Sequence, residues 1–334
     1  MGKKHKPRSG SLAYYPRKRA KRETPSFSSM PETKTEEVKP LNFFGYKAGM
    51  THVIGKNAHS ASVTYGSELS VPCTIIECPP LKVFGVRAYE KTTSGLKTLK
   101  EVLTEKTEKH LKKRIKSIGR KKSKHDLKEI ENSLGETSEI RLLVHTQPHS
   151  TGIGKKKPEV SEIHLSGKVE GQFAFSKDKL GKELKLEEVF KEKQFVDVKA
   201  VTKGKGFQGV IKRFGVKMHR PKAKKRRIVG SIGPWTPSTV MWTVARPGQM
   251  GYHNRTEYNK RVIMLGNKPD SVNPKGGFPY YGIIKNDFLV LSGSTPGIVK
   301  RCIALREPIR KTEEKKSNLM DISFVGTKAG VEAK

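Results

Sequence analysis

The residues best suited to chemistry lie between Val201 and Leu265, and the chemistry they suit is the binding of a polyanion. Fifteen Lys and Arg residues stand in this stretch against one acid, Glu257, and six aromatic residues and eight glycines interrupt the charge. Charged side chains are seldom buried without partners, and this stretch supplies almost none. The negative charge must come from another molecule. A polyanion that also offers flat faces to aromatic side chains is a nucleic acid.

The ends of this stretch read as strands, and its middle does not. Segments 198–202, 240–244 and 261–265 are rich in β-branched residues or able to pair with such segments, so each is a predicted strand. From Phe214 to Trp235 the sequence has neither a helical nor a strand period, and prolines interrupt it. Because a long irregular loop within a domain is usually functional, we expect residues 212–260 to form a basic finger that orders against its ligand.

The candidate contact residues of this region share a positive charge or a ring that can stack on a base. They are Lys203, Lys205, Lys212, Arg213, Lys217, His219, Arg220, Lys222, Lys224, Lys225, Arg226, Arg227, Trp235, Arg246, Tyr252, His253, Arg255 and Lys260. Trp235 stands in Gly-Pro-Trp-Thr-Pro, where stacking on RNA competes with packing. Trp242, within a predicted strand, is expected to be a core residue.

Residues 1–40 form a predicted basic arm and linker. The first 22 residues hold nine Lys and Arg and no acid, and residues 25–40 are rich in Ser, Thr and Glu, as in linkers. Such basic runs also occur in solvated tails and localisation signals. The interleaved Tyr, Gly and Pro favour an arm laid along nucleic acid, with Arg17, Lys18 and Arg19 as contacts.

The chain of 334 residues has a formal net charge of +36, and residues 1–22 together with residues 201–265 carry 23 of these charges. Charge is therefore concentrated rather than spread for solubility. Three cysteines, an odd number, suit a reducing compartment, and no apolar run approaches membrane length. From composition we expect a soluble, intracellular protein without membrane contact.

The predicted strand order is that of a mainly β protein with an α+β insertion. We expect strands at 43–46, 51–54, 71–77, 83–89, 140–145, 159–165, 281–284, 288–291 and 298–305, with 71–77 and 83–89 joined as a hairpin through Pro79-Pro80. Helical spacing is found at 96–103, 105–118, 125–134 and 184–190. Strands on both sides of a mixed segment favour a β-barrel with an insertion, because a parallel sheet would need strand–helix alternation throughout. The predicted parts are a barrel body at 41–95 plus 196–310, an inserted α+β subdomain at 96–195 and a flexible tail at 311–334.

Local motifs for cofactors, metals or catalysis are weak. Residues 204–209 match GxGxxG, but no acid follows where a dinucleotide ribose would need it, so a glycine-rich bend approaching phosphate is favoured. Cys73 and Cys78 lack a second pair for zinc, and Pro148 separates His145 from His149. No catalytic constellation is present, and we predict no cofactor, no metal and no small-molecule substrate.

Four segments resemble, in order and spacing, the universal ribosomal protein L-three family of the large subunit. They are Gly45–Thr51, Gly204–Val210, Gly230–Gly233 and Gly293–Gly297. The segments 16–20, 233–235 and 248–253 and the helical insertion are similar to its archaeal and eukaryotic branch. The likeness covers roughly residues 5–310.

This resemblance implies a six-stranded closed β-barrel of the translation-protein type with long basic extensions. It implies binding of large-subunit rRNA and neighbouring ribosomal proteins, support of subunit assembly, no enzymatic activity, and a place in cytoplasmic ribosomes. The Trp235 loop is expected near the peptidyl-transferase centre. Position 223 holds Ala where eukaryotic relatives carry a modifiable His, so that modification is not expected.

Two other classes remain open at this point. A DNA-compacting chromatin protein would also be basic, but it would need a repetitive surface rather than one irregular finger. An RNA-modifying enzyme would need an activated nucleophile, a metal or a cofactor site, and the sequence displays none.

Overall fold

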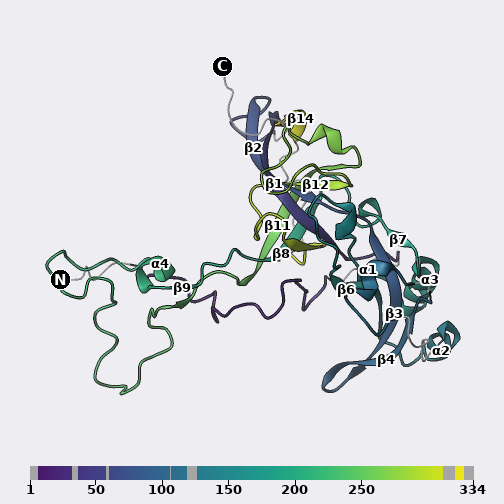
Figure 1. The fold of residues 1–334 in the computed structure, drawn as a ribbon, viewed down its shortest axis with the longest axis horizontal. Helices are drawn as coiled ribbons and strands as arrows, with labels where there is room; N and C mark the ends of the chain where they lie inside the picture. The colour runs from purple at the N-terminus through teal and green to yellow at the C-terminus, as the bar shows by residue number, and fades with distance from the viewer. Residues whose placement is uncertain are drawn as a thin grey trace. The chain divides into compact units, whose positions relative to one another are not determined.

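The computed structural model describes residues 7–31, 37–57, 60–105, 107–118, 126–310 and 320–326. It is mainly β, as predicted (Figure 1). The chain divides into two compact units. Residues 1–22 and 201–255 form the first, here the basic unit, and residues 23–200 and 256–334 form the second, here the sheet unit. In the described part of the chain, no helix is long and apolar enough to cross a membrane.

The larger sheet of the sheet unit has seven strands in the order β13-β8-β11-β12-β2-β1-β14, and β13 also pairs with β1. Its strands are β1 (Asn42–Asn57), β2 (Glu68–Glu77), β8 (Phe195–Val201), β11 (Asn254–Gly266), β12 (Phe288–Ser292), β13 (Cys302–Arg306) and β14 (Met320–Val325). Their buried apolar residues are mostly β-branched and aromatic, which suits a pleated, packed surface. The resulting core includes Phe43, Tyr46, Ile75, Phe288 and Ile303.

The segment 43–54 is one strand rather than the two predicted around a turn. β1 runs through the expected turn, and its pairing with β2 shifts register between Lys47 and Gly49. A β-bulge absorbs the extra residue and bends the strand without ending it. Gly49 also has no room for a side chain, because a Cβ there would lie 2.6 Å from the Phe278 ring.

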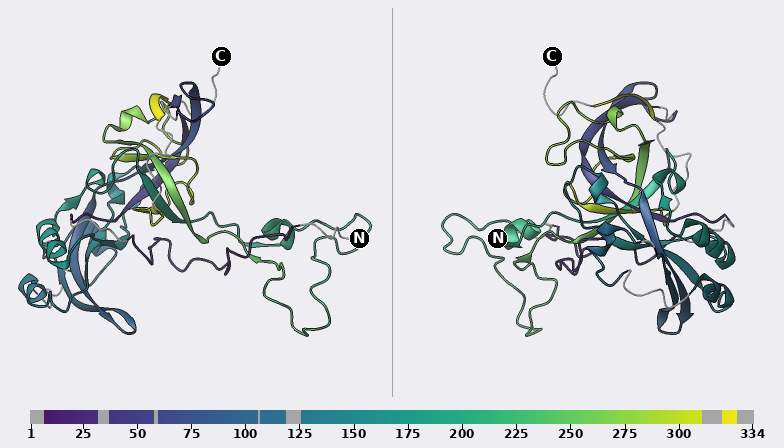
Figure 2. Two further views of the ribbon diagram at one scale, coloured as in Figure 1. Left: turned by 180° about the vertical axis from the view of Figure 1, so that it is seen from behind. Right: turned by 45° about the vertical axis from the view of Figure 1, so that its right-hand side comes forward.

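The smaller sheet has the strand order β4-β3-β5-β6, with β7 pairing β3. Its strands are β3 (Leu81–Thr92), β4 (Gly95–Leu103), β5 (Glu139–His145), β6 (Val160–His164) and β7 (Glu183–Leu184). Figure 2 shows from two further sides how the β3–β4 hairpin projects from this sheet. The predicted hairpin of 71–77 with 83–89 is wrong. Both strands form, but Pro79-Pro80 joins strands of different sheets, since proline cannot donate to a ladder.

Helices are shorter than expected. They are α1 (Lys109–Lys112), α2 (Leu127–Asn132), α3 (Val169–Lys179) and α4 (Val210–Phe214), with 3₁₀ turns at Pro148–Ser150, Leu186–Glu188 and Pro269–Ser271. Figure 1 shows α1, α2 and α3 gathered around the smaller sheet. The predicted helix at 96–103 is strand β4, because its hairpin pairing with β3 outweighs a local helical period. The predicted helices at 105–118 and 125–134 contain only α1 and α2, and residues 106 and 125 of these segments lie outside the described part of the chain.

Other boundaries differ in ways that pairing explains. Segment 281–284 is not a strand, because residues 278–282 close a tight loop instead. The last predicted strand begins at Cys302 rather than at residue 298. Residues 320–325, expected to belong to a flexible tail, form β14 on the edge of β1, while 311–319 and 327–334 lie outside the described residues. The smaller sheet begins at Leu81, earlier than the insertion boundary expected at 95/96.

The basic unit has little regular structure. It contains β9 (Phe207–Gln208), paired with β10 (Gly248–Gln249), and α4. The strand predicted at 240–244 does not form: the segment pairs with no strand of the described residues, and Pro237 and Pro247 flank it. Trp242, expected in the core, is 65% exposed for the same reason.

Candidate nucleic-acid interface

The basic unit holds 22 Lys and Arg residues and no acid. Its positive side chains therefore have no carboxylate partner within their own unit. Its cohesion must come from other contacts, which are backbone carbonyls and aromatic faces.

The arm is attached to the finger by hydrogen bonds to backbone carbonyls. The Ala20 amide donates to the Tyr252 carbonyl at 2.8 Å. Nδ1 of His253 lies 2.8 Å from the Lys18 carbonyl oxygen, and this imidazole is buried. Burial lowers the pKa of His253; the bond to Lys18 opposes this, and nearby guanidiniums, that of Arg255 first, reinforce it. A neutral His253 that donates to Lys18 satisfies both groups, so its role here is to fix the arm.

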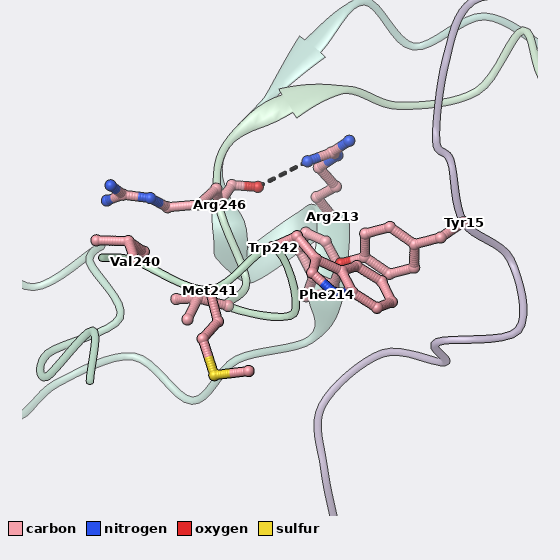
Figure 3. Close-up of a pocket in the computed structure, with 8 residues that line it drawn as sticks. Tyr15, Arg213, Phe214, Val240, Met241, Trp242 and Arg246 are labelled. Carbon is pink, nitrogen blue, oxygen red and sulfur yellow. Dashed lines mark hydrogen bonds between the residues drawn. The ribbon is translucent and has the colours of Figure 1, made fainter. Parts of the chain in front are cut away.

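A small aromatic cluster holds the next part of the arm (Figure 3). The Arg17 guanidinium lies over the Phe214 ring, 4.4 Å from its centroid, and Tyr15 stacks on the same ring at 6.4 Å. The Trp242 ring meets Tyr15 edge to face at 5.1 Å. Phe214 is buried, although its helix has five residues. These rings line an open pocket of about 290 Å³ together with Val240, Met241, Val244, Arg213 and Arg246.

Arg213 joins two parts of the finger through carbonyl oxygens. Its Nε donates to the Gln249 carbonyl at 3.0 Å, and its Nη1 donates to the Arg246 carbonyl at 2.8 Å, the bond drawn in Figure 3. Burial and the nearby Arg17 lower the pKa of Arg213, although a guanidinium remains charged at any physiological pH. Arg213 therefore holds the finger together and still contributes its charge.

The most basic segment of the finger is an exposed loop. The His219 amide donates to the Arg226 carbonyl at 3.1 Å, and the Ala223 amide donates to the Arg220 carbonyl at 3.0 Å. These bonds close a turn whose exposed cations are Arg220, Lys222, Lys224, Lys225, Arg226 and Arg227. We call residues 219–227 the basic loop. Like charges crowded on one turn repel each other, and an external polyanion relieves that repulsion.

The glycine-rich segment is a point of close backbone approach. Gly251 has φ +70°, and a Cβ there would lie 2.0 Å from the Lys203 carbonyl oxygen. The Lys205 amide donates to the Met250 carbonyl at 3.0 Å. Lys203 and Lys205 are exposed beside this crossing. A short helix, α4, does follow the GxGxxG match, but the acid of a dinucleotide site is absent from the sequence.

The two tryptophans have different surroundings. Trp235 is 96% exposed, between Pro234 and Pro237. Trp242 retains an edge contact with Tyr15. Trp235 therefore has a face free to stack on a base.

Among the described residues there is no group of three or more His, Cys, Asp or Glu that could hold a metal ion. The three cysteines are free and buried, and burial raises the pKa of each thiol, that of Cys73 to about 11.

Comparison with known proteins decides the family. The model for "Ribosomal protein L3" matches residues 1–330. The chain belongs to the ribosomal protein L3 family. It is 46% identical to "Large ribosomal subunit protein uL3" of Methanosphaera stadtmanae, over 98% of both chains. It is 44% identical to the protein of that name from Methanobrevibacter smithii (98% of this chain, 99% of the relative) and 45% identical to that from Methanothermobacter thermautotrophicus (98% of both).

Membership in the L3 family makes the chain a structural ribosomal protein and not an enzyme, and its place in the cell is the ribosome. These predictions are confirmed, as is the archaeal type of the sequence. Family membership therefore excludes the alternative of an RNA-modifying enzyme.

The predicted contact residues of this L3 chain divide by exposure. Exposed are Lys18, Arg19, Lys203, Lys205, Lys212, Lys217, His219, the cations of the basic loop, Trp235 and Arg246. Half-buried are Arg17, Arg213, Tyr252 and Arg255, while His253 is buried. Lys260 belongs to the sheet unit, where it forms an ion pair with Glu257 at 2.8 Å.

Sequence reasoning missed the residues that join arm to finger. Nothing in the sequence around Tyr14 indicates that the Arg255 guanidinium lies over its ring, 4.8 Å from the ring centroid. Phe214 and Trp242 likewise serve the arm. The signal in the sequence was that aromatic and arginine residues occur together in both stretches.

Proposed function

We propose that this protein binds large-subunit rRNA through its basic unit and supports assembly and architecture of the large subunit. The exposed cations on the arm and finger contact phosphates, and the half-buried arginines and His253 keep arm and finger in one arrangement. Neighbouring large-subunit proteins are the other expected partners. The observation that carries the proposal is a unit with 22 cations, no acid and a largely exposed basic loop.

We infer that the body is the six-stranded closed barrel expected from the sequence. The pairing order β13-β8-β11-β12-β2-β1, together with the pairing of β13 with β1, supports this. Closure removes unpaired strand edges, and a closed body offers fixed ends from which loops can extend.

Trp235 is the proposed contact at the tip of the finger, near the peptidyl-transferase centre. Its exposure of 96% and the flanking prolines support a stiff platform for a base. Stacking of one base on an aromatic side chain contributes about 1–3 kcal/mol. A DNA-compacting role has no comparable support, since the finger is a single irregular loop.

The test is the salt dependence of binding to protein-free large-subunit rRNA. Log K falls as log salt rises, and each phosphate contact steepens this fall by about 0.7–0.9. Replacing Lys222, Lys224, Lys225 and Arg226 with Gln should therefore make the slope less steep by about 3–4. The matched control replaces exposed lysines of the sheet unit with Gln, namely Lys109, Lys112, Lys113 and Lys116.

The control should leave the slope nearly unchanged. If both quadruple variants make the slope less steep by the same amount, binding depends on net charge and not on the basic loop. A flat slope in the unmodified protein would contradict phosphate binding altogether.

A further inference from the structure

The sheet unit has a second feature that points to RNA, in the loop that precedes β12. The Phe278 amide donates to the Gly282 carbonyl and the Gly282 amide donates to the Phe278 carbonyl, both at 2.9 Å. The three residues between them form a tight tip. Tyr280 stands at its centre, and its side chain is 89% exposed.

Tyr280 occupies a backbone conformation that disfavours it. Its φ is +64°, in the left-handed region that Gly or Asn normally fills in tight loops. For a bulky aromatic residue this geometry is unfavourable, and such strain persists where the surroundings impose it and often where function requires it. A loop selected for stability alone would hold Gly or Asn at this position.

The surroundings do impose it, from both sides of the tip. Phe278 is buried in the space left by Gly49, and Tyr281 is buried with its hydroxyl donating to Glu77. Glu77 is fully buried and also accepts from the Lys285 amide at 2.9 Å and from Asn286 Nδ2 at 2.7 Å. Phe278, two residues before Tyr280, and Tyr281, directly after it, are therefore fixed in the core, so the backbone that carries the exposed ring is held in place.

A further pair of bonds fixes the base of the loop. Nδ2 of Asn273 donates to the Ile284 carbonyl at 2.9 Å, and the Ile284 amide donates to Asn273 Oδ1 at 3.0 Å. Beside it, Asn286 Nδ2 donates to the Ser150 carbonyl at 3.3 Å, which joins the loop to segment 150–158.

The loop of Tyr280 and the segment it is bonded to are rich in lysine. Segments 150–158 and 273–286 together carry five lysines and no acid. Lys156, Lys157, Lys275 and Lys285 are exposed, and Lys155 is paired with Glu159. An exposed ring on a loop whose own and adjoining segments carry exposed cations suits a nucleic acid, whose bases stack and whose phosphates attract lysine, better than it suits an apolar protein surface.

We propose that Tyr280 is an RNA-stacking residue, held by its loop to receive one unpaired base while the adjacent lysines contact the flanking phosphates. This is a contact site separate from the basic unit. It rests on the proposed function in that the RNA is the large-subunit rRNA.

Photocrosslinking in assembled large subunits tests the contact directly. Tyr280 is replaced with p-azidophenylalanine in the full-length chain, and subunits are irradiated and separated into RNA and protein. We expect the chain to become attached to rRNA, with an unirradiated sample as background. Attachment to another ribosomal protein would show that the ring serves a protein interface, and no attachment would show that it has no neighbour; either result overturns the proposal.

Two substitutions separate the ring from the backbone. Tyr280→Asn removes the ring but suits the left-handed conformation, so the melting temperature of the free protein should be unchanged or higher. Its affinity for protein-free large-subunit rRNA should fall about 5- to 150-fold, the equivalent of one lost stack. Tyr280→Phe keeps the ring and should bind as the unmodified protein does.

The slope of log K against log salt distinguishes this inference from the proposed function. Tyr280→Asn should reduce affinity without changing the slope, whereas the basic-loop variant changes the slope. A normal slope with unaltered affinity in Tyr280→Asn overturns only the stacking role. A Tyr280→Asn protein that melts well below the unmodified one would show that the ring supports the fold, which also overturns it.

Discussion

The Arg17 guanidinium lies over the Phe214 ring, with its central carbon 4.4 Å from the ring centroid, and this contact joins residues far apart in the sequence. Nη2 of the same guanidinium donates to the Ser11 carbonyl at 3.1 Å. One arginine thus fixes the course of the arm and its attachment to α4. The cation–π contact contributes in the range of about 0.5–2 kcal/mol, more when it is shielded from water.

Phe214→Ala should release the arm from the finger. The buried ring is the platform for both Arg17 and Tyr15, so its loss removes local packing worth about 3 kcal/mol or more. We expect trypsin to cleave residues 7–22 faster in the variant, while the melting temperature of the sheet unit is unaltered. Phe207→Ala, at a ring 76% exposed in the same unit, is the control and should cleave at the original rate. Equal cleavage in all three proteins would show that Phe214 does not hold the arm.

Trp235→Ala and Trp242→Ala should both leave the melting temperature of the free protein nearly unchanged. The sequence predicts a core role for Trp242, but this residue is 65% exposed and meets Tyr15 by an edge contact. Loss of that contact is worth about 0.5–1.5 kcal/mol and should loosen the arm. Trp235→Ala should alter the peptidyl-transfer rate of assembled subunits without preventing incorporation. A strong drop in melting temperature for Trp235→Ala would show that the indole is packed rather than free.

Asp197→Ala should destabilise the sheet unit strongly. Asp197 and Arg306 are both buried and lie opposite each other on β8 and β13, with Oδ2 2.9 Å from Nη2. Removing one member leaves a buried charge without its partner, at a cost of about 3–5 kcal/mol. Urea unfolding measures it. Asp178→Ala, which breaks an exposed pair with Lys182, is the control and should not shift the midpoint. A similar midpoint for both variants would show that the buried pair adds nothing to stability.

Acid should weaken the smaller sheet through Glu139. Burial raises the pKa of this carboxyl, but hydrogen bonds from His164 and Arg141 outweigh it and lower the pKa from 4.5 to about 2. Because the folded pKa lies below the unfolded one, the contribution is complete above about pH 4.5 and is lost as pH falls toward 2. It is on the order of 2–3 kcal/mol.

Unfolding free energies at pH 6 and pH 3 test this, with Glu139→Gln as the matched variant. The variant should be less stable at pH 6 and lose less between the two values. Identical pH dependence in the two proteins would exclude Glu139 as the responsible group.

Strands with β-branched, apolar residues were predictable from the sequence because their pattern is local. Segments 71–77, 140–145 and 288–291 lie within β2, β5 and β12. Segment 96–103 was not, since its helical spacing was overridden by pairing with β3. The exposed cations were equally predictable, because an excess of basic over acidic residues is visible in the composition. The arm–finger contacts were not, because nothing near Arg17 in the sequence points to Phe214.

Tyr280 shows the limit of reading residue types alone. Its sequence context, Pro-Tyr-Tyr-Gly, resembles a weak strand, and two adjacent tyrosines have opposite fates, one buried on Glu77 and one exposed. Only the loop closed by Phe278 and Gly282 assigns those fates.

The carbonyl acceptors of Arg17 and Arg213 set how the basic unit responds to its surroundings. A guanidinium that donates to a carboxylate is neutralised by it, but one that donates to a peptide oxygen keeps its full charge. Acidification toward pH 3, which protonates carboxylates, therefore removes no internal counterion from this unit, while it weakens the glutamate network of the smaller sheet. The carbonyl bonds of these two arginines should therefore persist in acid. The arm still responds at His253, because protonating this buried imidazole adds a positive charge beside Arg255, so acid weakens the two parts of the chain by different means.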